Sequence, residues 1–150
     1  QLFISGLLHD IGKLIVYKYF PDHAIACFQQ AHAEDKSVYQ AERKLLGMYH
    51  SQIASHLLKK WNLPSDLSDN IVNHHRPHKA QHLKNAGIVH LADILTHGLG
   101  VGNSGERSIP RIDYPIVEKT MTSKAEIRLI VRQAMHQLGP MESIFKGSSS

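Results

Sequence analysis

Cysteine is nearly absent from this chain, because Cys27 is the only one among 150 residues. A single thiol can neither form a disulfide within the chain nor build a thiolate cage around a metal ion. We therefore expect a reducing, cytoplasmic setting. Long apolar runs are also missing: none approaches the ~20 residues that span a bilayer, and no basic leader precedes the first apolar residues. Neither a membrane segment nor a signal peptide is expected.

A concentrated positive face is lacking as well. The formal net charge is +4, yet the basic residues are dispersed, and Arg43-Lys44 and Lys59-Lys60 are the only adjacent basic pairs. Nucleic-acid-binding surfaces cluster lysine and arginine, often between aromatic side chains, so we expect no nucleic-acid partner. A solvated surface of mixed charge explains this composition better.

Strand patterns are nearly absent, whereas apolar residues recur at helical spacing along much of the chain. Ser37 and Gln40 have the spacing of a capping box, which marks a helix start. The glycines and proline between Gly98 and Asp113 predict a loop, either a contact surface or a flexible connector. Helices are expected at about 1–19, 22–33, 37–47, 51–61, 65–74 and 82–97, in a short turn after Pro115, and from a second capping box at Ser123 to Gly139-Pro140. We therefore predict an all-α fold, an irregular multi-helix bundle.

The length suits one compact domain, which we place at residues 1–146, followed by a flexible tail at 147–150. The first apolar residues already have helical spacing, but no N-cap residue stands before Gln1. The sequence is therefore interpreted as a domain that lacks its N-terminal part.

Histidine is abundant, with twelve in the chain. Imidazole nitrogen and carboxylate oxygen are the ligand types that hold one or two transition ions in hydrolase-type sites. These ligands are scattered in the sequence, so the helices must pack together before a site exists. The candidate metal ligands, each in or beside a predicted helix, are His9, Asp10, His50, His74, His75 and Asp93.

Several features around these residues fit an ion and an anionic ligand. On one continuous helix His9 and Asp10 diverge by about 100°, so an ion would lie between them and take further ligands from other helices. Lys13 lies one turn after His9, where a cation suits an anion such as phosphate. Gly12 allows a neighbouring helix or a ligand to approach the backbone closely. Asp93 stands among apolar neighbours, where its burial requires a cation or a hydrogen-bond donor.

The segment from Leu7 to Lys13, LLHDIGK, resembles the signature of the HD-domain metal-dependent phosphohydrolases. Further blocks narrow the resemblance to the HD-related output domain, HDOD. The segment WNLP at 61–64, followed by I-x-x-H-H-x-P at 71–77, separates HDOD from its relatives. With blocks near residues 42–54 and 88–93, the resemblance covers roughly two thirds of the chain.

The resemblance implies an all-α fold and a role in bacterial signal transduction, often beside receiver, diguanylate cyclase or phosphodiesterase modules. It matches His9 and Asp10 to the HD pair and Asp93 to the closing aspartate of the superfamily. The further ligands that it implies, for a site with two metals, are His50, His74 and His75. One or two divalent ions would be held, and Fe, Mn, Zn and Ni all suit such a ligand set.

Two departures from the superfamily concern activity. Its first histidine lies on a helix before the HD pair, and no residue stands before Gln1 to supply it. The Gly-Tyr-Pro segment of the related HD-GYP phosphodiesterases is replaced here by residues 76–80, RPHKA, which argues against cyclic di-GMP hydrolysis.

Alternatives to the metal site remain open at this point. The six candidate ligands could form a histidine–aspartate hydrogen-bond network without an ion, and Lys13 could be a solvated lysine paired with an acid. His90, Asp93 and His97 share one helix face and form a rival metal set, although a surface-exposed stripe explains both histidines as well.

The remaining candidates receive ordinary interpretations. Trp61 and Leu63 are expected in the core. Glu42 is expected on the exposed surface of its helix, and a role in supporting a metal ligand is the less favoured interpretation. The histidines expected at the surface or at helix caps are His23, His32, His56, His78, His82 and His136.

Two functions of different classes follow. The first, which we prefer, is a signal-transduction output module, in which the metal organises the core and the surface meets an adjoining domain or a protein partner. The second is a metal-dependent phosphohydrolase acting on a nucleotide or another phosphoester, with Asp10 and Lys13 as its catalytic residues. There Asp10 anchors the metals, which activate water, and Lys13 stabilises charge on the phosphate oxygens.

Overall fold

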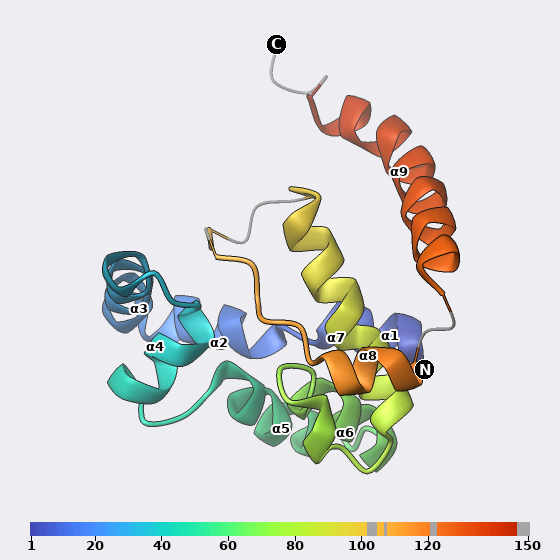
Figure 1. Ribbon diagram of the computed structural model, residues 1–150. Coiled ribbons are helices and arrows are strands. Elements are labelled where there is room, and N and C mark those ends of the chain that lie inside the picture. The colour runs from blue at the N-terminus through green and yellow to red at the C-terminus, as the bar shows by residue number, and fades with distance from the viewer. Residues whose placement is uncertain (102–104, 107, 121–122, 147–150) are drawn as a thin grey trace. The chain divides into compact units, whose positions relative to one another are not determined.

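The computed structural model describes residues 1–101, 105–106, 108–120 and 123–146. The chain divides into two compact units, 1–120 and 121–150. Every regular element among the described residues is a helix, so the predicted all-α fold is confirmed. The elements of the first unit are α1 (Leu2–Leu8), α2 (Ile11–Tyr19), α3 (Pro21–Glu34), α4 (Val38–Leu45), α5 (His50–Lys60), α6 (Ser65–Val72), the 3₁₀ helix η1 (Pro77–Lys79), α7 (Leu83–Gly98) and α8 (Tyr114–Thr120) (Figure 1).

The structure breaks the segment predicted as one helix over 1–19 at His9 and Asp10. Asp10 has φ −102° and ψ 11°, outside the α-helical region. The prediction was wrong because each half has its own apolar face: α1 packs on α6 and α7, whereas α2 packs on α3 and α5. Helical spacing therefore continues in the sequence across a corner in the chain.

The corner between α1 and α2 is held by the main apolar cluster of the first unit. Leu8 and Ile11, on either side of the corner, pack against buried residues of α5 and α6. Leu58 and Ile71 are fully buried in that cluster, and each such side chain contributes about 1.5–3 kcal/mol. This cluster therefore fixes the corner against α5 and α6. One segment of candidate ligands begins α5, and another follows α6.

A second apolar cluster joins α3 to α4 and includes Cys27, Ala31, Val38 and Ala41. The predicted capping box that opens α4 is confirmed, since the Gln40 N–H donates to Ser37 Oγ over 3.4 Å. The lone thiol is buried there and free.

The two residues expected in the core differ in outcome. Leu63 packs against the main cluster, as predicted. Trp61 is 49% exposed, so its predicted core position is wrong. It lies at the C-cap of α5, beyond the regular turns whose spacing predicted its burial.

The second unit is described over 123–146 and consists of α9 (Lys124–Lys146). Its predicted start is confirmed, because the Glu126 N–H donates to Ser123 Oγ over 3.2 Å. Its predicted end is wrong: the helix continues through Gly139 and Pro140, because local helix propensity is a weak preference that the rest of the structure can override. The tail predicted at 147–150 lies outside the described residues, and the single domain placed at 1–146 stays a prediction. None of the helices described is long and apolar enough to cross a bilayer.

Candidate metal centre

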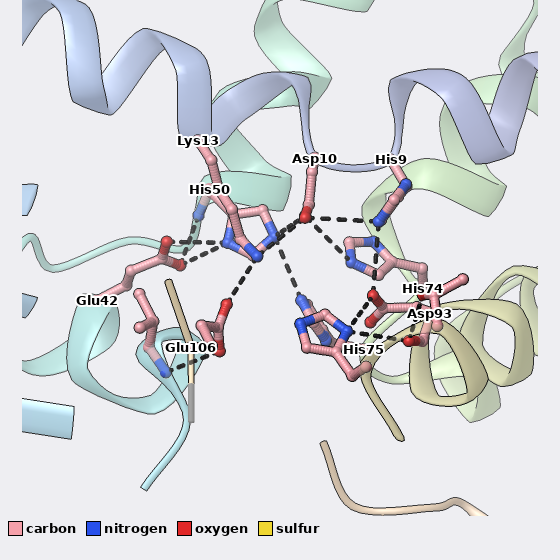
Figure 2. A network of polar contacts seen from close by, with 12 residues as sticks. His9, Asp10, Lys13, Glu42, His50, His74, His75, Asp93 and Glu106 are labelled. Carbon is pink, nitrogen blue, oxygen red and sulfur yellow. Dashed lines mark hydrogen bonds and ion pairs between the residues drawn. The ribbon is translucent and has the colours of Figure 1, made fainter. Parts of the chain in front are cut away.

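The fold brings together all six side chains that the sequence proposed as metal ligands. His9 and Asp10 come from the corner between α1 and α2, and Asp93 comes from the middle of α7. His50 is the first residue of α5 rather than the residue before it. Figure 2 shows these side chains, with those of His74 and His75 that follow α6, directed toward a common centre.

The potential ligand atoms form two overlapping groups. In the first, Asp10, His50, His74 and His75 each offer an atom within 4.8 Å of the others. Asp10 Oδ1 lies 3.1 Å from His50 Nε2 and 3.8 Å from His74 Nε2. The Nε2 atoms of His50 and His75 are 3.2 Å apart.

The second group comprises His9, His74 and Asp93, again with ligand atoms within 4.8 Å of one another. His9 Nε2 lies 3.6 Å from Asp93 Oδ1 and 3.5 Å from Asp10 Oδ2. Asp10 therefore stands between the groups, with one oxygen facing each. Asp10 would therefore be able to contribute a ligand atom on the side of either group.

The outer nitrogens of three rings are occupied by the protein itself. The Nδ1–H of His9 donates to the Gly6 carbonyl over 2.8 Å, and that of His74 donates to the Ile71 carbonyl over 2.7 Å. The Nδ1–H of His50 donates to Glu42 over 2.8 Å. A hydrogen bond from Nδ1–H leaves Nε2 as the nitrogen that can bind a metal, which is how proteins orient histidine ligands. All three Nε2 atoms face the common centre.

Two buried atoms in the centre have no hydrogen-bond partner: Asp10 Oδ1 and His74 Nε2. Both are acceptors, and they face each other at 3.8 Å. Burying an acceptor without a donor or a cation costs about 1–3 kcal/mol. A divalent ion between these atoms would satisfy both, so the residues present fit the metal that the sequence predicts.

The pKa values of the site reflect burial and the short contacts. Burial raises the pKa of Asp10, but the His50 ring and the Lys13 ammonium outweigh it and hold that pKa well below its usual range. Burial lowers the pKa of His74 to about 3, and it lowers the pKa of His75 well below its usual value. Both rings therefore remain neutral, as a metal ligand must.

His9 and His50 behave in the opposite way. Burial lowers the pKa of His9, but its contacts with Asp93 and Asp10 outweigh burial and raise it. The pKa of His50 is raised in the same way by Asp10 and Glu42, against the effect of burial. A metal ion that binds these rings must therefore displace protons that they hold to higher pH than a free histidine would.

Glu42 contacts the candidate site, whereas the sequence analysis placed it on the surface, and this expectation was wrong. The residue is only 3% exposed, and its carboxylate accepts both the backbone N–H and the Nδ1–H of His50. A signal was present: Glu42 lies one turn after Val38, on the buried face of an amphipathic helix. Its carboxylate fixes the orientation of the His50 ring.

Replacing Glu42 with glutamine is expected to weaken metal binding by about 10- to 100-fold, the usual effect of losing a partner behind a ligand. The amide keeps the shape of the side chain but removes the charge that orients His50. Titration with a competing chelator measures the change. Glu118→Gln, an exposed change on α8, is the matched control. Equal metal affinity in the two variants would show that Glu42 plays no part in the site.

Lys13 is buried and doubly paired. It is 5% exposed, and its Nζ lies 2.9 Å from Asp10 Oδ2 and 2.8 Å from Glu106 Oε1. Burial lowers the pKa of Lys13, but these two carboxylates outweigh burial and raise it, so the ammonium stays charged. The alternative interpretation, a solvated lysine paired with an acid, is therefore confirmed for the pairing. It is wrong about solvent exposure, because the lysine is buried.

Glu106 was missed by the sequence analysis. It lies 93 residues after Lys13, in the segment between α7 and α8 that was predicted as a loop. No local pattern marks it, because a carboxylate in a loop is usually solvated. Only the tertiary structure places it against Lys13 (Figure 2).

The rival set of His90, Asp93 and His97 is not among the groups that could hold an ion in the described part of the chain. His90 is 2% exposed and its Nε2 accepts the Asp113 N–H, so a surface position was wrong for it. His97 packs back on its own helix and donates from Nδ1 to the Asp93 carbonyl. The histidines expected outside the core are confirmed as exposed: His23, His32, His56, His78, His82 and His136.

The first unit thus defines a class of protein: an all-α domain built around an adjacent histidine–aspartate pair at a helix corner, with further histidines and an aspartate from other helices. A family model described as the HDOD domain matches residues 1–77, and the chain belongs to the HDOD family. The match includes the residues of the first ligand group, and Asp93 and Glu106 lie beyond it. No curated protein and no solved structure gave a significant match.

Proposed function

We propose that this HDOD domain binds one or two divalent transition ions and acts as an output module in signal transduction. The observation that carries the metal proposal is the pair of buried atoms, Asp10 Oδ1 and His74 Nε2, that face each other at 3.8 Å and have no hydrogen-bond partner. The donor set of histidine nitrogen and carboxylate oxygen suits Fe, Mn, Zn or Ni. The first group has four ligands and the second has three, so the first would be filled at the lower metal concentration.

Two observations favour the module over an enzyme. His50 and His74 are fully buried, so an ion that they hold would organise the packing of four chain segments. Lys13, the cation that a substrate anion would use, is already held by two carboxylates. The module's surface would then meet an adjoining domain or a protein partner.

A metal-dependent phosphohydrolase is the second candidate. The Lys13 ammonium lies beside the carboxylate that separates the two ligand groups, and this position suits a phosphate oxygen. When bound, the ions would supply Lewis-acid activation of water and of a phosphoester. The side chains of the two ligand groups would hold the ions, and Lys13 would orient the anion.

Metal analysis and turnover of a phosphodiester test both candidates on the same preparation. The purified protein is analysed for Fe, Mn, Zn and Ni, and then assayed with bis(p-nitrophenyl) phosphate in added Mn or Fe. We expect bound metal and no turnover above that of Asp10→Ala. Absence of tightly bound metal would overturn the metal proposal, and turnover that disappears in Asp10→Ala would replace the module with the enzyme.

A further inference from the structure

A cavity of about 580 Å³ lies beside the candidate metal centre in the first unit. Its wall includes His75, a member of the first ligand group, together with Tyr39 of α4 and His90 of α7. The segment between α7 and α8 contributes Ile109 and Arg111. A molecule in this cavity would therefore be one side chain away from the candidate metal centre.

His90 carries a buried donor that the fold does not use. The residue is 2% exposed, and its Nε2 accepts the backbone N–H of Asp113 over 3.1 Å. Burial lowers the pKa of His90, and the His74 backbone offsets this effect only in part, so the ring is neutral. Since Nε2 is the acceptor, the single proton of the neutral ring is on Nδ1. This Nδ1 is buried and has no hydrogen-bond partner among the described residues.

Tyr39 brings a second buried hydroxyl or ring donor to the wall of the same cavity. Its hydroxyl oxygen is buried and has no hydrogen-bond partner within the described part of the chain. Burial raises the pKa of Tyr39 to about 12, so the hydroxyl keeps its proton. The Ser51 hydroxyl opposes that rise, yet its own oxygen is likewise without a partner. Because a buried donor without an acceptor is unfavourable, both wall residues favour a ligand that supplies acceptors.

The ring of Tyr39 is already packed on its faces. Tyr49 stacks on it with the centroids 4.0 Å apart, and the His75 ring lies 4.2 Å away at 43°. These short separations leave no room for a further ring on Tyr39, which therefore offers a ligand its hydroxyl and its edge. Packing fixes the position of that hydroxyl before any ligand binds, and this lowers the entropy cost of binding.

The charges around the cavity balance one another. Lys36 Nζ, for example, lies 2.8 Å from Glu34 Oε2. A free oxyanion would gain little from such a surface, since no excess of positive charge attracts it. An uncharged ligand is better suited to this wall, which also has apolar side chains such as that of Ile109. The charged residues among the described lining are two acids and two bases: Glu34, Asp35, Lys36 and Arg111.

We infer that this cavity binds the uncharged base of a mononucleoside or mononucleotide, with Tyr39 and His90 as its hydrogen-bond donors. A nucleobase carries carbonyl oxygens and ring nitrogens, which are acceptors, along the edge of a flat apolar ring. This combination matches two buried donors in a wall of mixed polarity. The inference goes beyond the proposed function, because it concerns an organic ligand and requires no bound ion.

Isothermal titration of the purified protein with adenosine, cytidine, inosine and uridine tests the site. At the binding efficiency usual for ligands of this size, we expect a Kd of roughly 0.1–1 mM for the best of them. Tyr39→Phe should weaken that binding about fivefold, the usual effect of losing one hydrogen bond. Tyr19→Phe is the matched control, because Tyr19 is exposed on α2, and its Kd should equal that of the wild-type protein.

The free energy of unfolding gives a second readout, which a purely structural role of the hydroxyl would change. Because this hydroxyl has no partner in the fold, Tyr39→Phe should be at least as stable as the wild-type protein. A loss of stability would show that the hydroxyl is bonded within the fold, and it would overturn the inference. Ile109→Trp fills the cavity from an exposed position and should abolish binding, and it decides the test if Tyr39→Phe does not fold.

The remaining outcomes separate the inference from its rivals. Absence of binding by all four nucleosides at up to about 10 mM overturns it, as does equal binding by Tyr39→Phe and Tyr19→Phe. The 5′-monophosphate of the best nucleoside distinguishes the two sources of the base. Equal or weaker binding of the monophosphate indicates a site for the nucleoside, and tighter binding indicates a site for the nucleotide. If the tighter binding is lost in Asp10→Ala, the phosphate reaches the candidate metal centre.

Discussion

Replacement of Gly12 with alanine is expected to lower the free energy of unfolding by about 3 kcal/mol or more, a loss typical of a severe steric conflict in a core. A Cβ at this position would overlap the carbonyl oxygen of His50 and would lie 2.8 Å from its carbonyl carbon and 3.1 Å from Ala54 N. These are backbone atoms of α5, so no side chain can rotate away. Urea unfolding followed by circular dichroism measures the loss.

Gly6→Ala is the matched control, because Gly6 lies in α1 and a Cβ there meets nothing within 4 Å. Alanine at an open helical position should stabilise the domain by about 0.5–1 kcal/mol. The two substitutions are therefore expected to have opposite signs. Similar free energies of unfolding for both would contradict the close approach of α2 to α5.

Asp10→Ala is expected to remove the bound metal almost completely, a loss of at least about 100-fold in affinity. Asp10 is the carboxylate that faces both ligand groups, since Oδ1 lies near His50 and His74 while Oδ2 lies near His9. Its loss leaves the first group with imidazole ligands alone. The measurement is the molar ratio of metal to protein after gel filtration.

Asp22→Ala is the control for the loss of metal, because Asp22 is an exposed aspartate in the first turn of α3. Its metal-to-protein ratio should equal that of the wild-type protein. A ratio that is the same in Asp10→Ala and Asp22→Ala would show that the ion, if present, is held elsewhere.

Much of the candidate site was predictable because its residues carry chemical signals of their own. His9 and Asp10 stand in a short motif, and Asp93 is a carboxylate among apolar residues, which requires a partner wherever it is buried. The helices were predictable from apolar spacing, which depends on local sequence. These signals act over a few residues, and the structure agrees with them.

The remainder depended on contacts between distant segments. The corner at His9 and Asp10 has no glycine or proline at the break itself, and it forms because α1 and α2 find different partners. Glu106 becomes part of the site only through a contact 93 residues away. Glu42 was predictable in part. Its position on the buried face of its helix follows from the local sequence, but its role as an acceptor depends on where the fold places His50.

The helix corner has a thermodynamic consequence. The ligands at the corner meet those from α5, α6 and α7 only after the helices have docked, so the unfolded chain offers an ion no comparable site. An ion that binds only the native state shifts the unfolding equilibrium by mass action, by about 2.7 kcal/mol at a free concentration 100 times its Kd. The concentration of free metal would therefore affect the population of folded domain. A signal that changes the metal concentration would then change the amount of folded domain.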